Sequence, residues 1–270
     1  MATLYSKIPG REAEFRAKGV DSDGKQFKLA AAKVDIPGTT QSLEVVTANL
    51  ASGDKSFYYA EAVAKERIVV HFTAGYLWGD MAALTKKDNH VSVPFVVARD
   101  GTIYQLFSSK YWSYHLGKGA QGGNEAMSKS SIAIELSNVA YLRDKDGNLV
   151  DPYGNVYCTP ADTAAYQTLT KAYRGYTKFA TFTDAQYTSL ASLLKYLTAT
   201  YKIPAAFLPE DKRYDVYADV AKFKGITTHV NYQPESYGKW DIGPAFDWAR
   251  VIAALGTVPV SGVATPATTG

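Results

Sequence analysis

The sequence predicts an α/β fold, in which a single domain has a mixed central β-sheet flanked by helices and carries a small N-terminal appendage. Runs of aliphatic and β-branched residues, such as Ile68-Val69-Val70 and Ile132-Ala133-Ile134, are typical of strands buried on both faces. Between these runs lie segments with apolar residues at helical spacing, the clearest of which follows Thr183. Strands that alternate with helices in this way favour a mixed sheet with helices packed against it.

The composition is typical of a soluble globular protein, with 46% hydrophobic and 20% charged residues. The net charge of +3 is only mildly basic, and no dense Lys/Arg patch with interleaved aromatic residues is present, so we expect no nucleic-acid partner. The single cysteine, Cys158, excludes an internal disulfide and a cysteine-based zinc site. Any metal ion would therefore be held by His, Asp or Glu.

The N-terminal residues 1–7 contain no apolar segment of the kind found in secretory signals. No window approaches the roughly 18 apolar residues of a membrane span. We therefore expect a protein that is made in the cytoplasm without a signal peptide and has no integral membrane segment. If it acts outside the cell, another route must deliver it.

The chain divides into three predicted parts. Residues 1–62 show weak alternation near 27–29 and 43–46 and predict a small β-rich appendage or arm. Residues 63–256 form the predicted main domain. Residues 257–270 contain only Thr, Ala, Pro, Gly, Val and Ser and predict a flexible tail.

Apolar runs in the main domain predict buried strands at residues 67–72, 93–98, 102–107, 131–136 and 225–229. Asp100-Gly101 indicates a tight hairpin turn between the second and third runs. Helices are expected at residues 78–87, at 162–174, from Thr183 to Pro204, and from Pro244 to about Gly256. Thr183 and Gln186 fit a capping box at the start of the third helix. Residues 141–160, rich in Asp, Gly, Asn and Pro, predict a loop or small hairpin insertion.

Two of the four histidines, His71 and His229, each end an apolar run. If both runs are core strands, both imidazoles reach the same edge of the sheet. A zinc ion would need a third protein ligand and would keep a fourth position for water, and His115 and Asp241 are the candidates. The alternative for His71 is a core histidine that only completes a hydrogen bond.

Glu135 interrupts the apolar run at residues 131–136. A carboxylate in a buried strand needs a charged partner, a metal ion or a raised pKa. A structural salt bridge is therefore the alternative to a catalytic role.

Residues from about 65 to 255 resemble the zinc-dependent N-acetylmuramoyl-L-alanine amidases, the type that includes phage lysozyme-like amidases and peptidoglycan recognition proteins. The motifs that carry the resemblance are, in chain order, IVVHFTAG at 68–75, FVVARDGTI at 95–103, HLG at 115–117, SIAIEL at 131–136, and KWDIGPAFDW at 239–248 after His229. Each motif is modest alone. Their order, with the Lys-x-Asp spacing before Gly-Pro, makes the combination specific.

The roles that the resemblance implies are zinc ligands His71, His229 and Asp241, catalytic residues Glu135 and Lys239, and substrate-binding residues His115 and Thr73. Some relatives carry cysteine at the position of Asp241, and relatives that only recognise the wall lack a ligand there. The carboxylate of this chain therefore favours an active enzyme. The implied reaction is hydrolysis of the amide between N-acetylmuramic acid and L-alanine in peptidoglycan.

The chain departs from the family pattern at Val93-Pro94, where relatives often carry a polar His or Tyr, and residues 1–62 and 141–160 match nothing in it. Three alternatives stay open. The first is a non-catalytic peptidoglycan-binding module, the second an amidase that recycles soluble muropeptides in the cytoplasm, and the third a structural component with a vestigial amidase domain. A phage endolysin, or a wall-degrading part of an injection machine, would in addition need a delivery partner.

Overall fold

The computed structural model describes residues 3–233, 236 and 238–256, so the predicted tail at 257–270 lies outside the described residues. Its centre is a seven-stranded mixed sheet in the order β1-β2-β5-β4-β6-β3-β12. The strands are β1 (Phe27–Asp35), β2 (Ser42–Leu50), β3 (Arg67–Phe72), β4 (Phe95–Val97), β5 (Ile103–Gln105), β6 (Ser131–Leu136) and β12 (Gly225–Thr228). The predicted mixed central sheet is confirmed.

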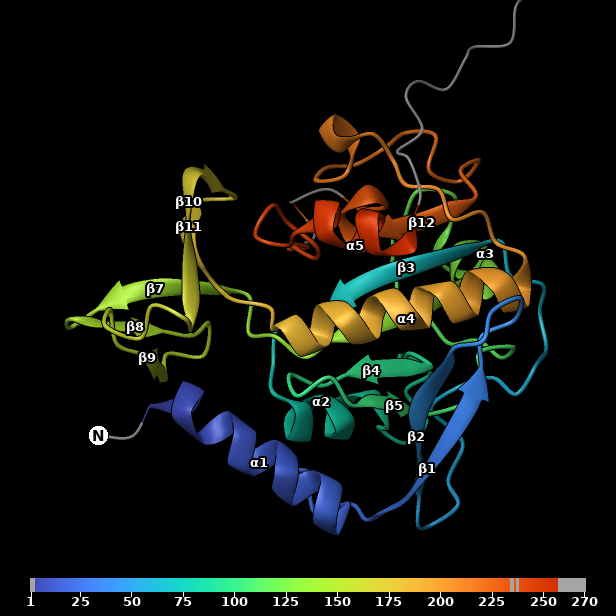
Figure 1. Ribbon diagram of the computed structural model, residues 1–270, viewed down its shortest axis with the longest axis horizontal. Coiled ribbons are helices and arrows are strands. Elements are labelled where there is room, and N and C mark those ends of the chain that lie inside the picture. Colours follow the sequence, from blue (N-terminus) through green and yellow to red (C-terminus); the bar gives the residue numbers. More distant parts are fainter. Residues whose placement is uncertain (1–2, 234–235, 237, 257–270) are drawn as a thin grey trace, which may run out of the picture.

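The middle of this sheet is parallel. β6, β3 and β12 pair in register, so that Ile68 of β3 lies opposite Ile132 on one side and Ile226 on the other, and β4 also runs parallel to β6. The carboxyl ends of these strands therefore meet at one edge, towards which the β3 arrow points in Figure 1. Ligands of open α/β sheets commonly bind at such an edge.

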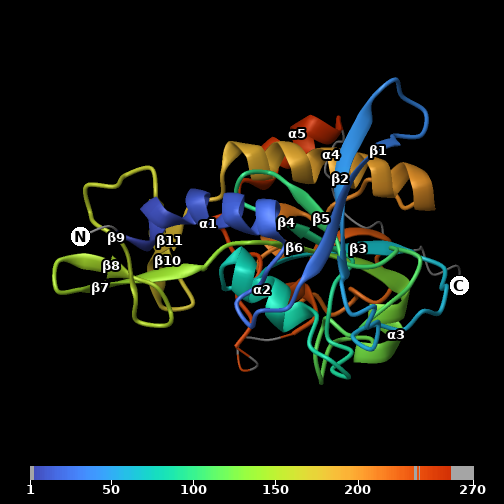
Figure 2. The same cartoon turned by 90° about the horizontal axis from the view of Figure 1, so that it is seen from below.

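Helices cover both faces of the central sheet. α4 (Asp184–Tyr201) and α5 (Trp248–Leu255) lie over one face, and α1 (Leu4–Lys18) and α2 (Leu77–Leu84) pack against the other (Figures 1 and 2). Successive residues of β6 point to opposite faces of the sheet. Ile132 and Ile134 pack with α4, whereas Ala133 between them packs with Leu77 and Met81 of α2. This alternation explains why the strand runs are apolar throughout. The short α3 (Asn124–Ser130) leads directly into β6.

The N-terminal segment is part of this packing. β1 and β2 form a hairpin where weak alternation predicted strands, and β2 pairs in parallel with β5 at the edge of the sheet. Helix α1 was not predicted, because Pro9 and a weakly apolar face obscure it. Its buried Glu12 carboxylate accepts the backbone N–H groups of Arg99 and Asp100, both at 3.0 Å. The division of the chain at residue 62 stays a prediction.

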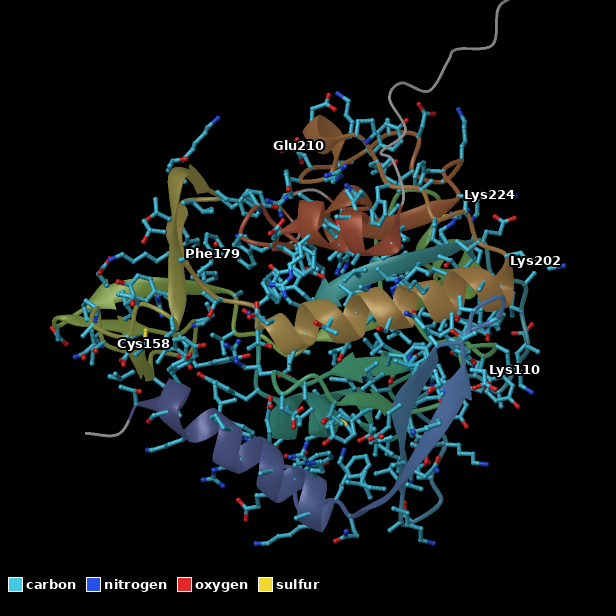
Figure 3. All side chains as sticks on the ribbon, viewed as in Figure 1. Lys110, Cys158, Phe179, Lys202, Glu210 and Lys224 are labelled. Carbon is cyan, nitrogen blue, oxygen red and sulfur yellow. The ribbon has the colours of Figure 1, made fainter. Side chains whose placement is uncertain are left out.

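A second, five-stranded sheet stands beside the first, in the order β10-β11-β7-β8-β9. Its strands are β7 (Tyr141–Lys145), β8 (Asn148–Val150), β9 (Val156–Cys158), β10 (Tyr166–Tyr173) and β11 (Tyr176–Ala180). In Figure 3 the labelled residues Cys158 and Phe179 belong to this second sheet. Here the helix expected at 162–174 is wrong. Arg174 and Gly175 both have positive φ, 49° and 84°, which matches a two-residue hairpin turn and pairs β10 with β11 instead.

None of the helices in the described part of the chain is both long and apolar enough to cross a membrane.

Candidate active site

The predicted site residues gather at the carboxyl ends of the parallel strands. His71 lies near the end of β3, and Glu135 is its register partner on β6, so both side chains emerge on the same face of the sheet. His229 follows β12 directly and begins a 3-10 turn, His229–Asn231. The backbone N–H of Val230 donates to the carbonyl of Asp241 at 2.8 Å, which brings the later loop to the same edge.

Three of these side chains converge on one point. Nδ1 of His71 lies 3.0 Å from Nδ1 of His229, and each of these nitrogens lies 2.9 Å from Oδ2 of Asp241. All three residues are buried. A core histidine that only completes a hydrogen bond does not account for this arrangement, because a second imidazole and a carboxylate meet the same nitrogen.

The partners of His71 fix its tautomer. Ser131 Oγ donates to the Met127 carbonyl at 2.7 Å, so its one hydrogen is used, and it accepts from Nε2 of His115, also at 2.7 Å. The other nitrogen of the neutral His115 ring is then an acceptor, and it takes the Nε2 hydrogen of His71 at 3.1 Å. His71 therefore has its hydrogen on Nε2 and a lone pair on Nδ1.

His229 has the same tautomer, which a different partner fixes. Its Nε2 donates to the carbonyl of Leu116 at 2.9 Å, which again leaves a lone pair on Nδ1. Metal-binding histidines are oriented in this way, with the nitrogen that does not bind the metal donating to a protein acceptor.

The electrostatics of the cluster fit a cation. Burial lowers the pKa of His71 to about 4, against the hydrogen bond to Asp241, so its ring is neutral at pH 7. Two lone pairs and a carboxylate thus face one another at about 3 Å, and a positive ion between them removes the repulsion. Two imidazoles and one carboxylate are also a ligand set found in zinc enzymes.

Glu135 lies beside this cluster without an ion-pair partner in the described part of the chain. Its Oε2 atom is buried and accepts no hydrogen bond there. Burial, followed by the charges of Asp241 and Asp80, raises its pKa well above the usual range. The structural salt bridge weighed from the sequence is therefore absent among the described residues, and the carboxyl group faces the cleft.

The cleft itself has a volume of about 270 Å³. Thr73 and Ala74 form one wall, and Lys239 and Trp240 form another. Lys239 lines the same cleft as His71 and Glu135. Thr73 Oγ1 accepts the N–H groups of Gly75 and Asn138 at 3.2 and 3.3 Å, so it also shapes its own wall.

Sequence reasoning missed two contributors. Asp80 is buried behind the Thr73 wall, accepts a hydrogen bond from Ser137 at 2.8 Å, and fills the space next to Gly75, where any Cβ would lie 2.2 Å from its Oδ1. A buried acid beside a glycine loop gives no signal in a single sequence. Ser131 was noticed only as part of a strand, although it completes the hydrogen-bond chain behind His71.

A larger cavity of about 520 Å³ lies between β10 and the start of α5, and none of the predicted site residues lines it. The structure therefore brings the seven predicted residues to the smaller cleft, and their individual roles stay predictions. His115 lines that cleft, yet both its ring nitrogens have partners inside the protein.

Comparison with known proteins identifies the family of the chain. The model of the family described as N-acetylmuramoyl-L-alanine amidase matches residues 62–244. The chain belongs to this amidase family. In this member of the family, a buried cluster of His71, His229 and Asp241 could hold a metal ion.

The individual relatives are distant. The 1,6-anhydro-N-acetylmuramyl-L-alanine amidase AmpD of Salmonella typhimurium is 29% identical over 165 residues, which are 61% of this chain and 57% of that protein. The chain thus spans little more than half the length of the curated relatives it matches.

Among solved structures, the amidase AmiD from E. coli, in complex with anhydro-N-acetylmuramic acid-L-Ala-D-gamma-Glu-L-Lys, is 22% identical, with a TM-score of 0.46 over 83% of this chain and 66% of that one. The amidase LysC from Clostridium intestinale URNW is 16% identical, with a TM-score of 0.41 over 74% and 93% of the two chains.

Proposed function

We propose that this chain is a zinc-dependent amidase that cleaves the bond between N-acetylmuramic acid and L-alanine in peptidoglycan. The observation that carries the proposal is the convergence of the Nδ1 atoms of His71 and His229 with Asp241 at a cleft that also holds Glu135. Family membership supplies the class of substrate. A module that only binds the wall would have no use for an unpaired acid beside such a cluster.

His71, His229 and Asp241 would hold the zinc ion. When bound there, zinc would supply a Lewis acid and an acidified water molecule. His115 orients the imidazole of His71 by accepting its Nε2 hydrogen, and the carbonyl of Leu116 orients that of His229 in the same way.

Glu135 and Lys239 act on the substrate amide. Glu135, which lines the cleft, takes a proton from the attacking water at its carboxylate and returns it to the departing amine of L-alanine. Lys239 places a positive charge beside the substrate carbonyl, where negative charge develops, and a single such donor is typically worth about 3–4 kcal/mol. Thr73 and the cleft-facing part of His115 contact the bound muropeptide.

Two substrates are consistent with this chemistry. Intact wall is expected for an endolysin or for an enzyme delivered by a phage or an injection machine. A soluble anhydro-muropeptide in the cytoplasm is the second candidate, and the name of the Salmonella relative favours it.

The decisive experiment is mass spectrometry of the products formed from purified sacculi and, separately, from a soluble anhydro-muropeptide. Release of intact stem peptides that begin with L-alanine is expected, and it should stop when a chelator is added. Glu135→Gln should retain bound zinc and lose turnover, and Asp241→Ala should lose the zinc, as measured by elemental analysis. Glu210→Gln is the matched control, because this exposed acid, labelled in Figure 3, does not line the cleft.

Cleavage at another bond would replace the proposed reaction. Full activity in chelator would remove the metal from it. If only one of the two substrates is cleaved, the choice between wall degradation and recycling is made.

A further inference from the structure

We propose that the second sheet adds a saccharide-binding subsite to the cleft, formed by Trp240, Tyr141 and Tyr176, which we name the aromatic row. The subsite would hold a sugar ring of the glycan strand next to the muramic acid at the reacting centre. This inference rests on the proposed function, since it assumes that peptidoglycan enters the cleft.

The aromatic row runs from the cleft onto the second sheet. Trp240 lines the cleft, one residue before Asp241. Its ring centroid lies 5.4 Å from that of Tyr141 on β7, with the planes tilted by 57°. Tyr141 in turn stacks on Tyr176 of β11, at 3.7 Å and 16°. Tyr141 and Tyr176 are therefore stacked face to face, Trp240 lies tilted against Tyr141, and the row leads away from the reactive groups.

These rings are not needed to fill a core. Tyr141, Tyr176 and Trp240 are each partly exposed, and none belongs to the apolar clusters that hold the two sheets and their helices together. Tyr157 on the same small sheet shows the contrast, because it is fully buried among apolar neighbours. Partly exposed aromatic rings next to a cleft provide a large apolar contact area with few rotatable bonds to order on binding.

The aromatic row is held rigidly with respect to the cleft. Tyr153, in the turn between β8 and β9, donates its hydroxyl hydrogen to the carbonyl of Ala74 in the opposite wall at 2.7 Å. Tyr76 donates to the buried Asp151 of the same turn at 2.8 Å. The small sheet is thus attached to both walls of the cleft, through Ala74 on one side and Trp240 on the other. A rigid surface loses little conformational entropy when a ligand binds.

The chemistry of the row suits a sugar more than a stem peptide. Its three side chains are uncharged, flat and aromatic, which matches the apolar C–H face of a pyranose ring. A stem peptide carries carboxylates and would call for free cations. The basic side chains beside the two tyrosines are engaged, because Arg143 donates to the carbonyls of Asp151 and Pro152 and Lys178 pairs with Asp144. Lys239, next to Trp240, is the group proposed above to act on the substrate carbonyl.

The test uses peptide-free glycan strands, which lack the amide between muramic acid and L-alanine, so the full-length metal-loaded protein can be titrated by calorimetry without turnover of that bond. The variants Tyr141→Ala and Tyr176→Leu should each bind these strands about three- to tenfold more weakly, the range expected for loss of one aromatic contact. Tyr111→Ala is the matched control, because it removes a partly buried tyrosine that stacks on Tyr58 and does not line the cleft. Circular dichroism verifies that each variant is folded.

A second measurement separates the subsite from the reaction itself. Cleavage of a single soluble muropeptide should be unchanged in the control Tyr111→Ala, whereas in Tyr141→Ala the KM for long glycan substrates should rise with little change in kcat. Equal binding of peptide-free strands by the wild type and both row variants would overturn the subsite while leaving the amidase proposal intact. Weaker binding of free stem peptide, rather than of glycan, in the row variants would also overturn it. Loss of all amidase activity with retained, row-dependent glycan binding would instead contradict the proposed function alone.

Discussion

At the scale of single residues, the cluster depends on hydrogen bonds behind the candidate ligands. His71 has its Nδ1 lone pair directed at Asp241 only because His115 accepts the Nε2 hydrogen and Ser131 accepts from His115 in turn. The candidate ligands are therefore supported by an outer group of residues, His115 and Ser131, which hold the ring of His71 in place. This outer group decides which nitrogen of the imidazole is available to a metal.

His115→Ala should weaken zinc binding by about 10- to 100-fold, because His71 then loses the acceptor that fixes its tautomer. His115→Gln should retain more affinity, since an amide can accept from His71 and donate to Ser131. Competition with a chromophoric chelator measures both values. His90→Ala is the control, because His90 stacks on Tyr59 and contacts none of the cluster. Equal losses in the alanine and glutamine variants would indicate a packing role only.

Asp80 makes stability depend on pH. Burial raises its pKa from 3.8 to about 7, although Ser137 and Thr73 oppose the shift. Between pH 4 and pH 7, Asp80 is ionised in the unfolded chain but protonated in the folded protein. The free energy of unfolding therefore falls as the pH rises from about 4 to about 7. The loss attributable to Asp80 is about 4 kcal/mol.

Asp80→Asn should remove this contribution while keeping the hydrogen bond from Ser137. Urea unfolding of both proteins at several pH values gives the difference in the free energy of unfolding. The two curves should converge near pH 4 and separate towards pH 7, with the variant more stable at the higher pH. Parallel curves would show that Asp80 is ionised in the folded protein throughout.

At the scale of elements, the start of α4 illustrates what a sequence can specify. The Thr183 hydroxyl accepts the N–H of Gln186, and the Gln186 side chain accepts the N–H of Thr183, as the capping box predicts. Thr183 also donates to the Arg99 carbonyl, so the cap ties the helix to the turn between β4 and β5. Sequence reasoning could not foresee this last contact, because the two residues are 84 positions apart.

Thr183→Ala should lower the free energy of unfolding by about 1–2 kcal/mol, because both the cap and the tie to Arg99 are lost. Thr188→Ala on the same helix is the matched control. Its exposed hydroxyl only donates to the carbonyl one turn earlier, so its loss should change stability little. Chemical denaturation of the two variants tests the difference, and equal effects would mean that the capping contacts contribute no net stability.

Elements with one strong local signal were predicted well, and those that depend on tertiary contacts were not. Buried aliphatic runs located β3 and β6, and Asp100-Gly101 located the turn between β4 and β5. β10 was mistaken for a helix because its residues alternate weakly, and pairing with β11 decides its conformation. The positions of the candidate ligands at strand ends were visible in the sequence. The meeting of His71 and His229 at one edge followed from those positions, whereas Asp241 was preferred to His115 as the third ligand only through the resemblance, since no local pattern relates His71 to Asp241.

At the scale of the whole molecule, zinc should stabilise the fold. An ion that binds only the folded state adds about 2.7 kcal/mol at a hundred times its dissociation constant, which raises Tm by roughly 5–10 °C in a chain of this size. Differential scanning calorimetry with zinc added to metal-free protein measures the shift. Asp241→Ala should show no such rise, and Mg²⁺, which prefers oxygen ligands, should have little effect on the wild type. A zinc-induced rise that persists in Asp241→Ala would indicate binding elsewhere.

The separation of His71 from Asp241 along the chain, 170 positions, also has a consequence for biosynthesis. β3 and β6 precede β12 and the loop that carries Asp241 in the chain, so they leave the ribosome earlier. Until then His71 has neither of its two partners, and the nascent chain cannot assemble the three-residue cluster. Because of this order, the three-residue cluster can form only after nearly all of the described residues have been made.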